Sequence, residues 1–246
     1  MTTDRSDPPP VLAEGISLFL DLDGTLLDLV DHPDAVVADD DLRDILSRLR
    51  ERMAGRVAIV SGRSVQQLDR ILGDVAEDLA LSGSHGGEWR VNGETFRPPM
   101  PPALIQATDA MRDFARKYPA IFLEEKCLGT GFHFRAAPEL EEEAVGFARL
   151  LAEEFGLFLQ EGKMMAELRP VGHDKGSAIR GLMELPPLVG ALPVFAGDDV
   201  TDESGFAAVN DMGGYGVLVG EVRHSLARFR LAGPSAVREW LREFVQ

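Results

Sequence analysis

Short apolar runs and helical patterns alternate along this chain, an order that predicts an α/β fold. The runs Ile16 to Leu20 and Val57 to Val60 are apolar almost throughout, as is typical of buried parallel strands. Between them, apolar positions at helical spacing over 42–53 predict one face of a helix. Asp39 to Asp41 precede this face and suit an N-cap and a dipole-matched first turn, so we give these aspartates no function. Further helices are predicted over 65–72, 175–184 and 235–245, and strands over 79–82, 89–96 (a hairpin turning at Asn92-Gly93), 194–196 and 216–219.

The pattern changes after a cluster of prolines at 98–102, which predicts a linker. The following segment reads as helix, strand, strand, and then the same again (αββ twice), a unit that builds a small sheet with helices on one face. Because the first pattern then returns, we expect a core made of residues 12–100 and 171–246, with a smaller domain inserted at 101–170. The inserted helices are predicted over 103–117 and 139–155, and the strands over 121–125, 130–135, 157–160 and 165–168.

Composition and charge narrow the class of partner. The 246 residues are 45% hydrophobic, and 25 Lys and Arg against 41 Asp and Glu give a formal net charge of −16. A chain this acidic repels nucleic-acid backbones and anionic membranes. We therefore expect a small-molecule partner, and we expect no binding to nucleic acid or to membranes. An anionic substrate would then need a local positive patch or a metal. The sequence gives no oligomeric state, and a monomer is compatible with it.

Cysteine content and hydropathy bear on the compartment. Cys127 is the single cysteine, which excludes an intrachain disulfide and fits a reducing compartment. Residues 1–10 lack the apolar centre of a signal peptide, and prolines interrupt the weakly polar stretch from Leu185 to Gly197. We therefore expect a soluble cytoplasmic protein.

Three predicted strands end in polar residues at their carboxyl side, where open parallel sheets bind ligands. These ends are Asp21 to Thr25, Ser61 to Arg63, and Gly197 to Asp199. Gly24 lets the backbone turn, so the two aspartates of the first end can take different roles. The alternative is an ordinary turn, in which aspartate is common.

The run from Gly197 to Glu203 contains four carboxylates within six residues. These groups repel one another, and a divalent cation would relieve the repulsion. Mg²⁺ is suited to this role because it prefers oxygen ligands from one or two carboxylates, with waters and phosphate. Asp198 stands directly at a strand end, which favours a metal ligand, whereas Glu203 is better explained by a helix N-terminus.

Lys175 stands where a cation is unfavourable. Asp174 is a candidate N-cap, which puts Lys175 in the first helical turn, and the helix dipole disfavours a cation there by about 0.3–1 kcal/mol. A bound anion would make the lysine's position favourable, since helix N-termini and lysines both attract phosphate. The alternative is a solvated surface lysine. Ser61 is likewise a candidate phosphate-binding hydroxyl or a helix cap, and Arg63 a partner for a carboxylate or for substrate.

Together these residues resemble the four motifs of the haloacid dehalogenase superfamily of phosphatases, in the expected order. The motifs are Asp-Leu-Asp-Gly-Thr at 21–25, Ser61, Lys175, and Gly-Asp-Asp at 197–199. The repeated helix-strand-strand insert is similar to the cap of the subgroup that acts on sugar phosphates. The resemblance implies a Rossmann-like parallel-sheet core with an inserted smaller α/β cap domain.

Further runs resemble the trehalose-6-phosphate phosphatase family over nearly the whole chain. These runs are residues 84–88, 125–135, 162–170 and 197–203. The chain departs from the family at Cys127 and at Gly129-Thr130-Gly131, where a cap strand would normally be more apolar.

The resemblance implies catalytic roles for the core residues. Asp21 would form an aspartyl-phosphate, and Asp23 would act first as general acid and then as general base. Ser61 and Lys175 would bind the phosphoryl oxygens. Mg²⁺ would be held by Asp21, by the backbone carbonyl of Asp23 and by Asp198. The resemblance also implies three supporting residues that orient the catalytic groups and bound waters without contacting the phosphoryl group: Asp199, Asp202 and Arg63.

The resemblance also implies sugar-binding residues, most of them in the cap. These are Lys126, Arg135, Lys163 and Glu167 from the cap and His85 from the core. Simpler roles stay open for four of them: a backbone hydrogen bond for His85, solvation for the two lysines, and a cap glutamate as partner for Arg135.

The implied activity is Mg²⁺-dependent hydrolysis of trehalose 6-phosphate to trehalose and phosphate. A phosphatase of another sugar phosphate, such as sucrose phosphate, is the alternative with the same fold. A phosphomutase would return the phosphoryl group to a sugar instead of to water. A catalytically silent regulator of a synthase is the alternative from a different class, although such a protein has no need of this set of polar residues.

Overall fold

The computed structural model describes residues 7–29, 36–162 and 164–246. The chain divides into two compact units. Unit 1 comprises Met1–Arg97 and Asp174–Gln246, and unit 2 comprises Pro98–His173. Each unit has its own sheet and its own hydrophobic core.

Within the described residues, unit 1 is built on an eight-stranded sheet of order β12-β11-β10-β1-β2-β3-β4-β5. Strands β12 to β3 in this order are parallel, and β4 and β5 form an antiparallel hairpin at one edge. The strands are β1 (Ile16–Leu20), β2 (Val57–Val60), β3 (Ala80–Gly83), β4 (Glu88–Val91), β5 (Glu94–Phe96), β10 (Leu192–Gly197), β11 (Tyr215–Val219) and β12 (Phe229–Leu231). The helices are α1 (Asp40–Arg52), α2 (Val65–Leu72), α3 (Val75–Asp78), α6 (Lys175–Leu182), α7 (Glu203–Asp211) and α8 (Pro234–Val245).

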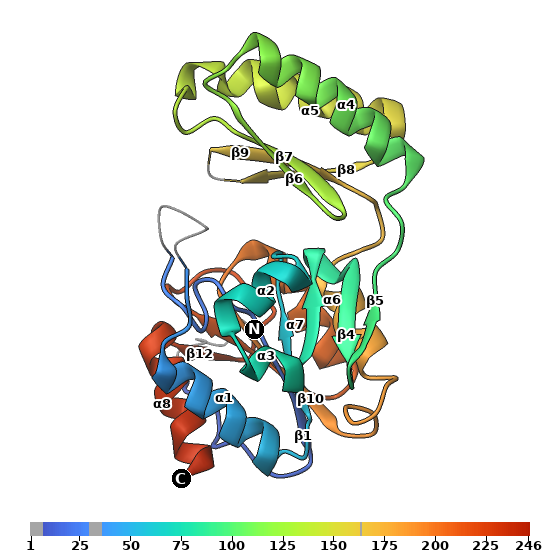
Figure 1. The fold of residues 1–246 in the computed structure, drawn as a ribbon. Coiled ribbons are helices and arrows are strands. Elements are labelled where there is room, and N and C mark those ends of the chain that lie inside the picture. The colour runs from blue at the N-terminus through green and yellow to red at the C-terminus, as the bar shows by residue number, and fades with distance from the viewer. Residues whose placement is uncertain (1–6, 30–35, 163) are drawn as a thin grey trace. The chain divides into compact units, whose positions relative to one another are not determined.

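Successive residues of each central strand enter two different cores, one on each face of the sheet. In β1, Leu18 and Leu20 belong to the cluster that includes residues of α1 and α8. Phe19 belongs to the second cluster, with Ile179 of α6 and Phe206 of α7. Helices therefore cover both faces, which explains why the strands are apolar throughout. Figure 1 shows α1 and α8 side by side on their face.

Strand β1 lies between β10 and β2, and the chain winds away from it in both directions. From β1 the chain builds β2 and β3 on one side, whereas β10, β11 and β12 follow one another on the other side. Such a switch point opens a crevice at the carboxyl ends of the strands. The backbones remain paired there, with Asp21 N donating to Ala196 O at 2.9 Å.

Unit 2 contains a four-stranded antiparallel sheet, of order β6-β7-β9-β8 in the described residues, and two long helices. Its elements are α4 (Pro102–Lys117), β6 (Phe122–Lys126), β7 (Gly129–His133), α5 (Glu141–Phe155), β8 (Phe158–Gly162) and β9 (Met165–Arg169). Phe132, Ala166 and Leu168 pack with residues of α4 and α5. The two helices lie along this one face of the sheet (Figure 1). The alternate residues of the strands occupy the opposite face.

The predicted element order and α/β class are confirmed, and several predicted ends are accurate. Gly73 ends α2, and Gly156 ends α5 in the left-handed conformation at φ +63°. Asn92 and Gly93 both have positive φ in the β4–β5 turn. Two short elements, α3 and β12, were not predicted; they are four and three residues long. The helix N-terminus predicted at Glu203 is confirmed, since α7 begins at that residue.

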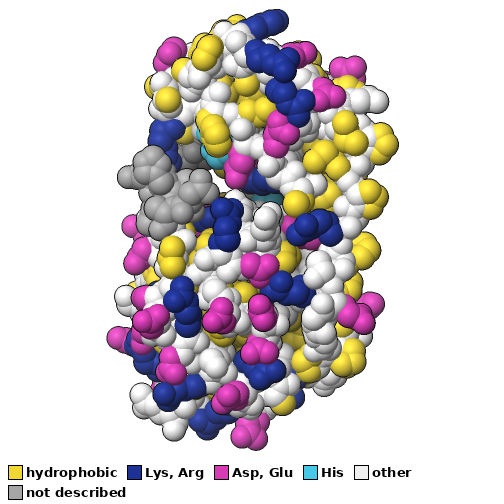
Figure 2. Space-filling view, viewed as in Figure 1, with side chains coloured by type: hydrophobic (Ala, Val, Ile, Leu, Met, Phe, Trp, Pro, Cys, Tyr) yellow, Lys and Arg dark blue, Asp and Glu magenta, His cyan; other side chains and the backbone are white. Residues whose placement is uncertain are grey.

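The surface carries mixed charge, and nothing in the described part of the chain forms a helix both long and apolar enough to cross a membrane. On the face shown in Figure 2, acidic and basic side chains are interspersed. The formal charge of −16 is therefore partly balanced locally on this face.

Candidate active site

Asp21, Lys175 and Asp202 form a buried ionic group in unit 1. Lys175 Nζ lies 2.6 Å from Asp21 Oδ1 and 2.5 Å from Asp202 Oδ1. The three residues are only 4%, 4% and 0% exposed, respectively. Charges as buried as these persist only when they are paired and hydrogen-bonded. The structure thus fixes the ammonium against both carboxylates.

Lys175 is placed by the start of α6. Asp174 caps this helix, its side chain accepting from Ser177 N at 2.6 Å. The helix dipole disfavours a cation in this turn, and the two carboxylates offset that cost. Burial also opposes the charge on Lys175, but Asp202 and Asp21 outweigh it and raise the pKa of Lys175 above its usual value. A solvated surface lysine, the alternative considered from the sequence, is excluded.

Asp202 is held on both of its oxygens. Its Oδ1 bonds to Lys175, and its Oδ2 accepts from Asp199 N at 2.8 Å. The Asp199 side chain in turn accepts from Val200 N. Gly197 makes room for Asp202, because a Cβ at residue 197 would lie 2.3 Å from its carboxylate carbon. Asp202 is therefore committed to Lys175 and to the local turn.

Carboxylates of Asp21, Asp198 and Asp202 converge, each with an oxygen within 4.8 Å of the others. Burial raises the pKa of Asp198 to about 6, and Asp202 adds to that rise. Burial also raises the pKa of Asp21 well above 3.8, with Lys175 opposing and Asp202 and Asp198 contributing. This concentration of hard oxygen ligands suits a small divalent cation. Both oxygens of Asp202 accept hydrogen bonds from the protein, and so do both oxygens of Asp21, from Lys175 and, at 3.3 Å, from Thr25 Oγ1. The side-chain metal ligands implied by the family resemblance are Asp21 and Asp198.

Gly24 allows the loop after β1 to approach the loop after β10, which carries Asp198. Its φ is +78°, which favours glycine, and a Cβ there would lie 2.0 Å from Asp198 Oδ2. Gly24 N also donates to Leu27 O at 2.7 Å, which tightens the turn. The loop after β1 therefore accommodates the Asp198 carboxylate only with glycine at this position.

Asp23 has different surroundings from Asp21. Its carboxylate accepts two hydrogen bonds from Arg63, at 2.6 Å from Nε and 2.7 Å from Nη2. The Asp23 side chain is 28% exposed, against 5% for Asp21. The backbone N–H of Arg63 also donates to Ser61 Oγ at 3.1 Å, and Ser61 is buried. The first two strand ends are thus linked through Arg63.

His85 lies against the loop that carries Ser61. Its backbone N–H donates to Ser61 O at 3.1 Å. A Cβ on Gly62 would lie 2.7 Å from the imidazole Cε1 and Nε2 atoms. His85 is 8% exposed and has φ +55°, a conformation that a non-glycine residue rarely adopts. The backbone bond expected for His85 is present, but the ring also has a defined place.

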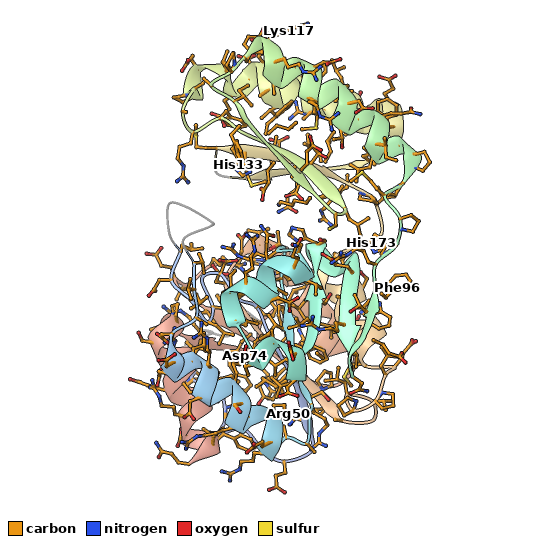
Figure 3. The ribbon with its side chains drawn as sticks, in the orientation of Figure 1. Arg50, Asp74, Phe96, Lys117, His133 and His173 are labelled. Carbon is orange, nitrogen blue, oxygen red and sulfur yellow. The ribbon has the colours of Figure 1, made fainter. Side chains whose placement is uncertain are left out.

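In unit 2, Lys126 and Glu167 form an ion pair across the sheet. Lys126 Nζ is 2.6 Å from Glu167 Oε2 and 3.7 Å from Glu124 Oε2. Burial disfavours the ammonium, but the two glutamates outweigh it and raise the pKa of Lys126. His133, labelled in Figure 3, lies 2.9 Å from Glu124 through its Nε2. Lys126 is therefore a paired residue and not a freely solvated one.

The glycines that depart from the family pattern have a structural role here. A Cβ on Gly129 would lie 2.4 Å from Glu167 Oε1, so glycine leaves space for that carboxylate. Gly131 pairs directly with Glu167 between β7 and β9, and with Glu124 between β6 and β7. The bare backbone of β7 thus lies beneath charged side chains from both neighbouring strands.

The two remaining cap residues implied by the resemblance are Arg135 and Lys163. Arg135 lies in an exposed turn after β7 and makes interactions of its own. Lys163 lies outside the described residues. Glu88, which is fully buried, and His133 lie in the runs that resemble the family but were given no role from the sequence, and Glu124 was not singled out at all. For Glu124 and His133, the signal was strand alternation combined with cross-strand register, and register is not readable from one sequence.

Comparisons with known proteins match this chain to one family over most of its length. The family model described as trehalose-phosphatase matches residues 19–235. The chain is 38% identical over 242 residues to the trehalose-6-phosphate phosphatase of Escherichia coli (strain K12), covering 97% of this chain and 90% of that protein. A solved structure described as a trehalose-6-phosphate phosphatase related protein is 29% identical with a TM-score of 0.77, covering 93% of this chain and 96% of that one.

The C-terminal domain of the C. albicans trehalose-6-phosphate phosphatase has a TM-score of 0.80 at 24% identity, covering 94% of this chain and 93% of that one, and shows the shared fold. The family match spans most of the sequence, and the Escherichia coli relative aligns over nearly its whole length. This chain therefore belongs to the trehalose-phosphatase family.

Proposed function

We propose that this protein hydrolyses trehalose 6-phosphate to trehalose and inorganic phosphate, with Asp21 as the nucleophile. The observation that carries the proposal is the buried group of Asp21, Lys175 and Asp202 with Asp198 beside it, in a member of the trehalose-phosphatase family. Unit 1 acts as the Rossmann-like phosphatase core and unit 2 as its cap.

The reaction divides into two steps, which suits the very slow hydrolysis of phosphate monoesters. In the first, an Asp21 carboxylate oxygen attacks phosphorus while the bond from phosphorus to the sugar oxygen breaks. Asp23, protonated at this stage, gives its proton to the departing oxygen. In the second, Asp23 takes a proton from water as the water oxygen attacks phosphorus. The bond between phosphorus and Asp21 then breaks and phosphate leaves.

The geometry of Asp23 is compatible with these two roles. Both of its oxygens accept hydrogen bonds from Arg63, which orients the carboxyl group. Its partial exposure gives it contact with water, whereas Asp21 is enclosed. The different surroundings of the two aspartates support one nucleophile and one proton carrier.

Lys175 and Ser61 bind the phosphoryl oxygens. Asp202 keeps Lys175 in place and charged, so the ammonium is available where negative charge accumulates in the transition state. Asp199 supports Asp202 through its backbone N–H.

Mg²⁺ is the proposed cofactor, and the donor set fits it. The side chains of Asp21 and Asp198 and the backbone carbonyl of Asp23 would hold the ion, and all three offer hard oxygen atoms. When bound, the ion supplies positive charge that reduces repulsion between the carboxylates and the phosphoryl group. Burial is the main cause of the raised pKa values of Asp21 and Asp198, and neighbouring carboxylates add to both, so a bound cation would favour their ionised forms.

The sugar is recognised mainly by unit 2 in this proposal. Lys126 and Glu167 form a rigid donor and acceptor pair of the kind that fixes sugar hydroxyls. Arg135, Lys163 and His85 are proposed as further contacts by the family resemblance alone. The substrate is a small sugar phosphate, and the proposal includes neither nucleic acid nor membrane.

Phosphate release from a panel of sugar phosphates tests the proposal. We expect turnover of trehalose 6-phosphate to exceed that of glucose 6-phosphate and sucrose 6-phosphate by at least about a hundredfold in kcat/KM, the range available to a site that hydrogen-bonds its substrate. Equal rates on the three esters would contradict disaccharide recognition. The variant Asp21→Asn, with nearly unchanged shape, should show no measurable turnover.

A further inference from the structure

Glu88 is a completely buried carboxylate that the proposed mechanism does not use. It is the first residue of β4 and is 0% exposed. Its Oε1 accepts from Val65 N at 3.0 Å and from Ser84 Oγ at 2.9 Å. Its Oε2 accepts from Arg97 Nε at 2.8 Å. Burying a charge without such partners is strongly unfavourable. These three donors therefore compensate for the burial of the Glu88 carboxylate.

The donors to Glu88 come from the two loops around Ser61. Val65 is the first residue of α2 and directly follows the loop Ser61 to Ser64. Ser84 belongs to the loop after β3, and its backbone N–H donates to Arg63 O at 2.8 Å. His85, the next residue, donates to Ser61 O. One carboxylate therefore links the chain segment that contains Ser61 with the loop that bonds to the Ser61 backbone carbonyl.

Glu88 does more than complete the start of α2. Ser64 and Gln67 form a reciprocal capping box there, and Glu88 accepts from the Val65 N–H, which the box does not use. The loop after β3, by contrast, has an unusual backbone, since Ser84 and His85 both have φ between +51° and +55°. Non-glycine residues keep such conformations only where surrounding contacts impose them. The Ser84 hydroxyl bond to Glu88 is one such contact.

The same loop also packs against the helix that carries Lys175. A Cβ on Gly86 would lie 2.7 Å from Asp174 O, at the N-cap of α6, and one on Gly83 would lie 2.6 Å from Val65 N. The loop after β3 therefore packs between the segment that contains Ser61 and the first turn of α6, which contains Lys175. Moving it would disturb both groups proposed to bind phosphate.

We propose that Glu88 is a positioning residue that sets the geometry of the phosphate-binding pair Ser61 and Lys175. It acts through Val65 and Ser84 and does not touch the reacting atoms. Arg97, the last residue of unit 1 before the chain enters unit 2 and next to Phe96 (labelled in Figure 3), supplies its charged partner. This inference rests on the proposed function, because it assigns Ser61 and Lys175 to phosphate.

A double-mutant cycle with Glu88→Gln and Ser61→Ala tests the inference. The Gln variant keeps the shape and one acceptor oxygen but places an amide donor or a neutral oxygen against Arg97. We expect each single variant to weaken binding of inorganic phosphate, measured by calorimetry with Mg²⁺ present, by about tenfold or more. The double variant should be no weaker than the worse single variant, to within about threefold.

Asp69→Asn is the matched control. Asp69 of α2 pairs with Arg90 of β4, at 2.6 Å, so this change weakens a different contact between the two elements that the bond from Val65 N to Glu88 also joins. Phosphate affinity should change by less than about twofold. If Glu88→Gln and Ser61→Ala have independent, multiplicative effects, or if the Asp69 variant is equally impaired, Glu88 is only structural and the inference is wrong.

Further variants keep the test independent of folding and of substrate. If Glu88→Gln does not fold, Ser84→Ala removes one of its donors and should show the same non-additivity with Ser61→Ala, and additive effects there would also overturn the inference. Phosphate binding by a wild-type protein that fails to hydrolyse trehalose 6-phosphate would refute the proposed substrate and leave Glu88 testable. A wild type that does not bind phosphate would overturn both.

Discussion

At the scale of single residues, the arrangement depends on charges that have been moved out of water. Lys175 separates Asp21 from Asp202 and offsets the repulsion between them. In exposed ion pairs, such as Arg180 with Asp211, water screens both charges, so losing one partner leaves no buried, unpaired charge. Removing the cation should therefore reduce the free energy of unfolding much more at the buried Lys175 group than at the exposed pair of Arg180 and Asp211.

Lys175→Met tests this difference. It leaves two buried carboxylates without their cation, and we expect a loss of about 3–5 kcal/mol in the free energy of unfolding, together with loss of turnover. Arg180→Ala should change the unfolding free energy by less than about 1 kcal/mol. Urea titrations of both variants at neutral pH provide the comparison. Similar stability losses in the two would show that burial of the Lys175 group has been overestimated.

A second residue-scale prediction concerns the glycines of β7. Gly129→Ala would place a methyl group where the Glu167 carboxylate lies, whereas the new methyl at Gly131 would meet its neighbours at 3.7–3.8 Å, an ordinary contact. We expect Gly129→Ala to raise KM for trehalose 6-phosphate by about tenfold, equivalent to one lost polar contact. The rate on a small aryl phosphate should stay unchanged.

Gly131→Ala is the control for this change, since it adds the same methyl group to the same face of the same strand. Its KM should rise less than that of Gly129→Ala. The reverse order would indicate that Glu167 does not contact the sugar in the way proposed.

At the scale of helices and strands, α1 and α8 illustrate how a cap and an ion pair combine. The Asp39 side chain accepts from Leu42 N at 2.8 Å and also from Arg238 of α8 at 2.7 Å. The Arg238 bond and the Leu42 N–H lower the pKa of Asp39 below 3.8. Asp39 thus stabilises both the start of α1 and its packing on α8.

We expect Asp39→Ala to cost about 1 kcal/mol of unfolding free energy at pH 7. A carboxyl group whose pKa is lowered by folding contributes stability above its unfolded pKa and loses it as the pH falls through the folded value. The difference between wild type and variant should therefore shrink below about pH 4. Asp39→Asn retains a good cap and should lose only the charge-dependent part. A stability difference independent of pH would contradict the role of the charge.

Strands and helices were largely predictable because their signals are local. Val57–Val60 is apolar at every position, and α2 has both a capping serine and a terminal glycine. The β12 strand is three partly buried residues at a sheet edge, too short for a periodic signal. The ion pairs were not accessible in the same way. Lys175 and Asp21 are separated by 154 positions, and only the fold brings them together.

The carboxylate run at 198–203 shows the limit of sequence reasoning most clearly. Mutual repulsion correctly indicates a need for positive charge, but the sequence cannot say which cation satisfies which carboxylate. Asp202 is neutralised by Lys175 from a distant helix, whereas Asp198 is left beside Asp21. The sequence pattern favours Asp198 as a metal ligand, and the family resemblance adds Asp21 and the backbone carbonyl of Asp23; all three assignments stay predictions.

At the scale of the whole molecule, the net charge of −16 opposes the approach of any phosphate ester. The proposed Mg²⁺ would counteract this field at the site, and its binding can be measured directly. Mg²⁺ at a hundred times its dissociation constant should stabilise the native protein by about 2.7 kcal/mol, visible as a rise in the melting temperature.

Asp198→Ala should lose most of that Mg²⁺-dependent rise, while Asp211→Ala, on the exposed surface, should keep it. Removing divalent ions with a chelator should also abolish wild-type turnover, and adding Mg²⁺ should restore it. A melting temperature that responds to Mg²⁺ equally in both variants would place the ion elsewhere.

The central claim is that Asp21 carries the phosphoryl group during turnover. Rapid acid quenching of the enzyme with trehalose 6-phosphate, followed by borohydride reduction and peptide mass spectrometry, measures this directly. We predict that reduction converts Asp21 alone to homoserine, and only when substrate is present. Conversion of another carboxylate, or an unmodified Asp21 in an enzyme trapped at full turnover, would contradict the account.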